Sequence, residues 1–186
     1  GYTAVITGGS KGIGADLGQR LIDKGYTVIS LSRGQPEWRS DKLIHVEVDL
    51  LDEKATEQAA QEIAAQHEVS HFIHNAGMIW PNLVEEARPS DLMGLTQLHL
   101  GCALTLVQAF LPSMKQKSFG RVLFNGSRAA LGVPTRTAYS ARGLWKWHLT
   151  ASRSMSSHPA LCKPTISGAL SKKAARASRS WLNAFP

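Results

Sequence analysis

The sequence is poor in cysteine and in long apolar segments. Its two cysteines, Cys102 and Cys162, lie far apart, with no C-x-x-C spacing and no neighbouring ligand pattern. We therefore expect structural thiols in a reducing cytosol and no metal or redox centre. No uninterrupted apolar run reaches the roughly eighteen residues that a membrane span needs. The first residues, 1–6, also lack the basic and apolar regions of a secretory signal. A cytoplasmic protein without a membrane segment is the expectation.

Acidic residues are absent from the C-terminal quarter. All 14 Asp and Glu residues precede Arg142, whereas 8 of the 21 Lys and Arg residues lie from Arg142 onward. The formal charge of +7 therefore belongs to the segment 142–186 and does not describe the rest of the chain. This segment also lacks strand-like apolar runs. We predict one domain over residues 1–141, followed by a basic, acid-free tail with little regular structure.

Before this tail, strand and helix patterns alternate. Short apolar runs predict strands over residues 2–6, 26–31, 43–48, 69–74 and 121–124. Helical spacing of apolar residues predicts helices over residues 15–24, 52–66 and 90–111, with Pro112 ending the last one. Strands separated by helices favour crossover connections and a parallel sheet. The predicted fold class is α/β with a Rossmann-like, doubly wound parallel sheet, truncated at its C-terminal part.

A glycine-rich segment lies between the first predicted strand and the first predicted helix. Residues 7–14 read Thr-Gly-Gly-Ser-Lys-Gly-Ile-Gly. Glycines let the backbone turn tightly and approach a phosphate, which then meets the free N–H groups and positive dipole of the helix. A plain strand–helix turn needs one glycine, whereas this segment has four. We predict a nucleotide phosphate site formed by Gly8, Ser10, Lys11, Gly12, Ile13 and Gly14.

The spacing of these glycines, Gly8-x3-Gly12-x-Gly14, resembles the phosphate loop of the short-chain dehydrogenase/reductases. Further motifs follow in that family's order and extend the resemblance over residues 1–141. The remaining matches are Asp49 at the position that contacts adenine, the second signature Asn75-Ala76-Gly77 in the cofactor cleft, and the pair Ser127 and Tyr139 at the active site. The resemblance implies an oxidoreductase that acts on a small-molecule carbonyl or alcohol substrate.

The cations near the phosphate loop predict which nicotinamide nucleotide is used. An acidic residue after the second strand would hydrogen-bond the 2′-hydroxyl of NAD and repel a 2′-phosphate. The second predicted strand is instead followed by Arg33, and Lys11 supplies a second cation. NADP-preferring relatives carry cations at both places, and a guanidinium binds phosphate in a bidentate manner. We therefore predict NADP as the cofactor, with no carboxylate opposing its 2′-phosphate.

The resemblance also implies the catalytic roles. Tyr139 would be the acid/base and Ser127 would polarise the substrate carbonyl, while His99 occupies the place of a common Asn and could relay a proton. The family's Lys, four residues after the Tyr, is replaced by Gly143. Because that Lys lowers the pKa of the Tyr, we expect catalysis to be crippled in this chain. Arg142 is a poor substitute, since its planar fork differs from an ammonium.

One hypothesis explains the lost Lys and the unusual tail together. Reading residues 143–148 and 155–160 one base earlier permits family-like sequence, so the chain after about Ala141 would be an out-of-frame translation. Two further functions stay open. Loss of the Lys favours a non-catalytic nucleotide-binding module, and the basic tail suggests a nucleic-acid binder. We do not expect the latter, because the tail lacks regularly spaced aromatic residues. The family forms homo-oligomers, but the quarter that supplies much of the interface has no matching residues here.

Overall fold

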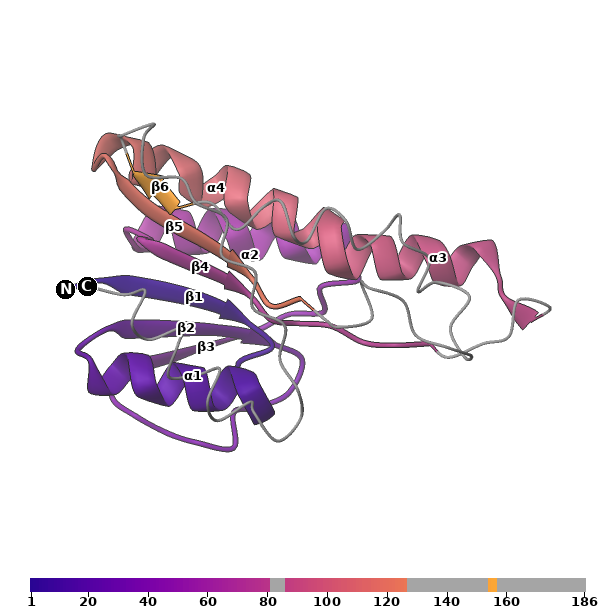
Figure 1. Ribbon diagram of the computed structural model, residues 1–186, viewed down its shortest axis with the longest axis horizontal. Coiled ribbons are helices and arrows are strands. Elements are labelled where there is room, and N and C mark those ends of the chain that lie inside the picture. The colour runs from indigo at the N-terminus through magenta and orange to yellow at the C-terminus, as the bar shows by residue number, and fades with distance from the viewer. Residues whose placement is uncertain (81–85, 127–153, 157–186) are drawn as a thin grey trace.

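The fold is built around one six-stranded sheet. The structure, a computed structural model, describes residues 1–80, 86–126 and 154–156. The strands are β1 (Thr3–Thr7), β2 (Thr27–Ser32), β3 (Leu43–Glu47), β4 (His71–His74), β5 (Phe119–Phe124) and β6 (Ser154–Ser156). They lie in the order β3-β2-β1-β4-β5-β6, and the first five run parallel (Figure 1). The predicted α/β class and Rossmann-like parallel sheet are confirmed.

Helices cover both faces of this sheet. They are α1 (Gly12–Asp23), α2 (Glu53–Gln66), α3 (Pro89–Thr96) and α4 (Cys102–Gln116), with a π-helical turn at Gln97–Gly101 between the last two. Successive side chains of a strand point to opposite faces. In β1, Val5 accordingly packs with α2 and α4, whereas Ala4 and Ile6 pack with α1 (Figure 1). All three side chains are completely buried, so the sheet is doubly wound around two apolar cores.

The strand order determines where a ligand can bind. Strand β1 lies between β2 and β4. After β1 the chain adds β2 and β3 on one side of it, and only then adds β4 and β5 on the other side. A crevice opens at the carboxyl ends of the strands where the order reverses in this way, and such crevices bind ligands in open α/β sheets. The glycine-rich segment follows β1 directly and therefore lies at this point.

The long apolar helix differs from its prediction. Pro112 does not end it, because α4 continues through this residue to Gln116. Proline removes one backbone hydrogen bond, and the carbonyl that loses its partner is that of Gln108. Both residues are exposed, so water can solvate this carbonyl. Burial of Phe110 and Met114 beside the proline stabilises the last turns of the helix.

The helical segment Pro89–Gln116 is apolar on average, although polar residues interrupt its apolar runs. It is long and apolar enough to cross a membrane by length and composition alone, with a mean hydropathy of 1.3. Core helices of globular proteins meet the same criteria. Leu106 and Phe110 of this segment lie in the core against the sheet, which is the position of such a core helix.

A short strand occurs where the sequence predicted none. Strand β6 pairs antiparallel with β5, with Met155 opposite Gly120. Its Ser-Met-Ser sequence has no apolar run from which a strand could be predicted. The outer edge of β5 offers unpaired backbone groups, and such an edge accepts a further strand largely irrespective of its side chains.

Candidate functional site

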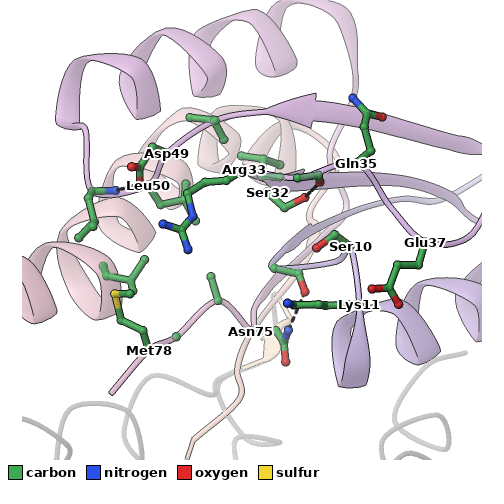
Figure 2. A pocket seen from close by; sticks show the side chains of 18 residues that line it. Ser10, Lys11, Ser32, Arg33, Gln35, Glu37, Asp49, Leu50, Asn75 and Met78 are labelled. Atoms are coloured by element: carbon green, nitrogen blue, oxygen red, sulfur yellow. Dashed lines mark hydrogen bonds between the residues drawn. The ribbon is translucent and has the colours of Figure 1, made fainter. Parts of the chain in front are cut away.

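A cavity of about 440 Å³ lies at the carboxyl ends of β1 to β4. Its wall comes from the segments that follow these four strands and from Leu98 in the π-helical turn (Figure 2). Eight of the eleven predicted cofactor residues line it, namely Gly8, Ser10, Lys11, Arg33, Asp49, Asn75, Ala76 and Gly77. The other three, Gly12, Ile13 and Gly14, form the first turn of α1. The structure thus brings residues from four separate segments to one site.

The phosphate loop requires glycine at several positions, for which Gly12 and Gly14 illustrate two different reasons. Gly12 has a φ of +58°, a conformation that residues with a side chain rarely adopt. A Cβ on Gly14 would lie 2.1 Å from the carbonyl oxygen of Gly8, so only glycine allows α1 to begin this close to the end of β1. The first turn of α1 holds no acidic residue. Its free N–H groups and positive dipole are therefore not neutralised locally and can bind an anion.

Thr7, the last residue of β1, connects the phosphate loop with the segment after β4. Its buried Oγ1 accepts hydrogen bonds of 3.0 Å from the backbone N–H groups of Asn75 and Ala76. The same oxygen lies 2.9 Å from Nδ1 of His74. Because both acceptor positions of the hydroxyl are used, its own hydrogen must be donated to His74. Nδ1 of this histidine is therefore the acceptor, and Thr7 has a structural role that the sequence analysis did not predict.

Two asparagines continue this network across the sheet. The side-chain Nδ2 of Asn75 donates to the carbonyl oxygen of Gly8 at 3.1 Å. Its Oδ1 accepts a hydrogen bond of 2.9 Å from Nδ2 of Asn125, which directly follows β5. The sequence analysis missed Asn125. The feature from which Asn125 could have been identified is its position, because it follows the fifth strand immediately, as Asn75 follows the fourth.

The cavity wall carries two cations and a carboxylate, Glu37, that the sequence analysis did not place there. Figure 2 shows Arg33 toward the end formed by Asp49 and Leu50, and Lys11 toward the end formed by Ser10 and Glu37. Glu37 therefore brings a carboxylate to the wall of the same cavity. Glu37 lies four residues beyond Arg33 in the sequence, past the end of the second strand. In the folded chain, a backbone hydrogen bond to Ser10 holds Glu37 beside the cavity.

His99 lies in the π-helical turn, and π-helical turns are frequent at functional sites. Its Nε2 is 3.1 Å from the carbonyl oxygen of Met78. A carbonyl only accepts, so Nε2 carries the hydrogen and Nδ1 is the acceptor nitrogen. Burial lowers the pKa of His99 below 6.5, although the hydrogen bond to Met78 acts in the opposite direction. The ring also packs on Gly77, where an added Cβ would be 3.0 Å from it. His99 thus lies beside the segment after β4, with its ring oriented by Met78.

The other two predicted catalytic residues lie outside the described residues. This applies to Ser127 and Tyr139, and equally to Arg142 and Gly143. Within residues 1–80 and 86–126, no group of three or more His, Cys, Asp or Glu side chains could hold a metal ion. Cys102 is completely buried, and burial raises its pKa to about 12, so its thiol is not reactive at neutral pH.

Comparison with known proteins agrees with this geometry. The family model described as short chain dehydrogenase matches residues 2–150, nine residues further than the resemblance predicted from the motifs. Among curated relatives, the 3-oxoacyl-[acyl-carrier-protein] reductase MabA of Mycobacterium avium is 28% identical over 141 residues, covering 75% of this chain and 54% of its own length. The chain spans little more than half the length of the curated relatives that it matches first.

Two solved structures show the same fold with a nucleotide in place. A 3-oxoacyl (acyl-carrier-protein) reductase from Agrobacterium tumefaciens with NADP bound has a TM-score of 0.67 at 24% identity, covering 80% of this chain and 60% of its own. A short chain dehydrogenase from Leptospira borgpetersenii with bound NAD⁺ has a TM-score of 0.65 at 22% identity, covering 72% of this chain and 54% of its own. At these identities the likeness shows the fold alone.

Proposed function

Because this chain belongs to the short-chain dehydrogenase family of oxidoreductases, we propose that its cavity binds NADP(H). The observation that carries the proposal is that two cations line one cavity. Lys11 comes from the loop after β1 and Arg33 directly follows β2, and both side chains line the cavity. A pyrophosphate would bind the free N–H groups of the helix, and the cations would bind the 2′-phosphate.

The residues of the cavity fit such a nucleotide. Asp49 is held by a hydrogen bond of 3.0 Å from the N–H of Leu51 to its Oδ1, which leaves its other oxygen to accept from an adenine amino group. Leu31, Val48 and Leu98 supply apolar wall for the base. At the other side of the cavity, His99 fixes the Asn75–Met78 backbone, along which the nicotinamide end would lie.

Fluorescence titration with NADPH and NADH tests this assignment. We expect NADPH to bind more tightly, because Lys11 and Arg33 offset the two charges of its additional phosphate. Equal affinity for the two nucleotides would contradict the assignment to NADP. Binding of neither would contradict a nucleotide site altogether. Among the structural relatives, one holds NADP and another NAD⁺, so the measurement on this chain is decisive.

For the reaction, we propose hydride transfer between NADP(H) and a carbonyl or alcohol substrate. The cofactor supplies the hydride, and the protein orients the substrate and moves the proton. By the family resemblance, Tyr139 exchanges the proton with the substrate oxygen and Ser127 hydrogen-bonds that oxygen. Because MabA and the Agrobacterium protein are 3-oxoacyl-[acyl-carrier-protein] reductases, a 3-oxoacyl thioester belongs in the substrate panel. Turnover that disappears in Tyr139→Phe would support this role.

A second candidate function is nucleotide binding without catalysis. It is favoured by Gly143, which stands where the family has its catalytic Lys. Without this cation, position 143 supplies no charge to lower the pKa of the Tyr139 phenol, which disfavours the phenolate needed for acid–base catalysis. We propose that the chain binds NADPH and turns over carbonyl substrates very slowly, and that residues after about 141 come from a shifted reading frame. NADPH binding without measurable oxidation would support this candidate, and sequencing of the coding DNA tests the frame.

A further inference from the structure

The segment that follows Arg33 is held against the phosphate loop by two hydrogen bonds. The backbone N–H of Glu37 donates to the carbonyl oxygen of Ser10 at 3.0 Å. The indole Nε1 of Trp38 donates to the carbonyl oxygen of Gly9, also at 3.0 Å. Both acceptors belong to the loop that begins the phosphate site. The position of Glu37 relative to this loop is therefore determined by its own backbone and by its neighbour.

The ring of Trp38 further restricts where the segment around Glu37 can lie. It packs on α1 at Gly18, where a Cβ would come within 2.7 Å of the indole Cζ2. A side chain at position 18 would push the ring away, so the small residue creates the surface on which Trp38 rests. Since the ring is fixed on one side by α1 and on the other by the hydrogen bond to Gly9, Glu37 is directed to the cavity that Ser10 and Lys11 also line.

Glu37 and Lys11 share this end of the cavity without forming an ion pair. Among the residues that the structure describes, the pairs within 4.0 Å are Arg20–Asp16, Arg88–Asp91 and Lys117–Glu68. The side chains of Glu37 and Lys11 are both exposed. A ligand entering here meets one cation and one anion that are not already neutralised by each other at close range (Figure 2).

We propose that Glu37 is a specificity-determining residue that limits the preference for NADPH over NADH. This inference rests on the proposed nucleotide site. A carboxylate near the adenosine ribose can accept a hydrogen bond from the 2′-hydroxyl of NADH, and it repels the 2′-phosphate of NADPH. Lys11 and Arg33 attract the phosphate, so the two nucleotides are discriminated by the balance between these cations and Glu37. The site then accepts NADPH while retaining useful affinity for NADH.

The test compares the chain with Glu37→Gln, which removes the charge and preserves the size of the side chain. The measured quantity is the ratio of the dissociation constants for NADH and NADPH. We expect this ratio to rise about tenfold in the variant at low ionic strength, because one unit charge a few ångströms from a phosphate is removed. The increase should shrink in 0.5 M salt, where exposed charges are screened. Calorimetry with adenosine 2′,5′-bisphosphate and 5′-AMP repeats the comparison with molecules that differ only by the 2′-phosphate.

Glu62→Gln is the matched control. It removes the same charge from the exposed face of α2, away from the cavity, and should leave the ratio within about twofold of the parent chain. A ratio that is equal in the parent and in Glu37→Gln would overturn the proposed role of Glu37 and leave the nucleotide site intact. No binding of either nucleotide by the parent or the variant would overturn the nucleotide site and, with it, this inference. A thermal melt of each variant verifies that the fold is retained.

Discussion

Strand β4 carries a buried histidine at each end, and the two are used differently. His71 begins the strand and His74 ends it, and both are almost completely excluded from solvent. At the carboxyl end, His74 accepts the hydroxyl hydrogen of Thr7 within the network that supports the cavity. At the amino end, His71 lies among the rings of Tyr2, Tyr26 and Phe119, with centroid separations of 5.1–5.5 Å.

We infer from this comparison that the two ends of the parallel strands differ in what they support, aromatic packing at the amino end and the cavity wall at the carboxyl end. The aromatic cluster around His71 lies at the end of the strands opposite to the cavity. The hydroxyl and amide groups around His74 leave backbone atoms of the phosphate loop and of the segment Asn75–Gly77 facing the cavity. Substitutions at the amino end should therefore change stability with nucleotide affinity preserved, whereas substitutions at the carboxyl end should change both. Four predictions test this division.

The largest effect is expected for Gly14→Ala at the carboxyl end. Its Cβ would overlap the backbone carbonyl of Gly8, so α1 must move away from the loop that it positions. We expect NADPH affinity to fall by about a hundredfold or more, and the free energy of unfolding to fall by about 1–3 kcal/mol. Fluorescence titration and urea denaturation measure the two effects. Gly126→Ala is the control, because no atom of the residues that the structure describes lies within 4 Å of its added Cβ, and affinity retained in Gly14→Ala would contradict the prediction.

The features behind this prediction illustrate what the sequence reveals. The four glycines in the segment 7–14 could be identified from spacing alone, because their conformational requirement is local. The strands and helices could also be predicted, since their apolar periodicity reflects burial against the sheet. Glu37 and Trp38 could not be placed in this way. Their position depends on contacts with Gly9, Ser10 and Gly18, which lie far from them in the sequence, and no local pattern records such contacts.

Thr7→Val should have the next largest effect. The substitution keeps the shape of the side chain but removes the acceptor of two backbone N–H groups and the donor to His74. We expect the free energy of unfolding to fall by about 2–4 kcal/mol, because buried polar groups lose their partners. Nucleotide affinity should fall as well, since the segment Asn75–Gly77 forms part of the cavity wall. Thr7→Ser retains the hydroxyl and should recover most of both losses; a Val variant as stable as the parent would refute the role of the hydroxyl.

His71 should make stability depend on pH. Burial, and secondarily the charge of Arg121, lowers the pKa of this histidine to about 4 from the ordinary 6.5. The unfolded chain therefore binds a proton between these values that the folded chain does not, so stability is lost as pH falls from 6.5 toward 4. Over this pH range we expect the free energy of unfolding of His71→Phe to fall by about 2–3 kcal/mol less than that of the parent chain. Urea denaturation of both proteins at pH 7, 5.5 and 4 measures the difference, and parallel pH profiles would contradict the assignment.

Tyr2→Leu should have the smallest effect and gives the sharpest test of the division between the two ends. Tyr2 is 42% exposed, and its ring contacts the rings of Tyr26, His71 and Phe119. Leucine preserves an apolar side chain but loses the ring contacts, so we expect the free energy of unfolding to fall by about 0.5–1.5 kcal/mol. NADPH affinity should stay within about twofold of the parent, because the network of Thr7 lies at the other end of the strands. The measurement is the same pair of experiments, denaturation and titration. If this mild change at the amino end weakened nucleotide binding as much as Thr7→Val does, the two ends would be coupled through the strands, and the separation of stability from function would be wrong.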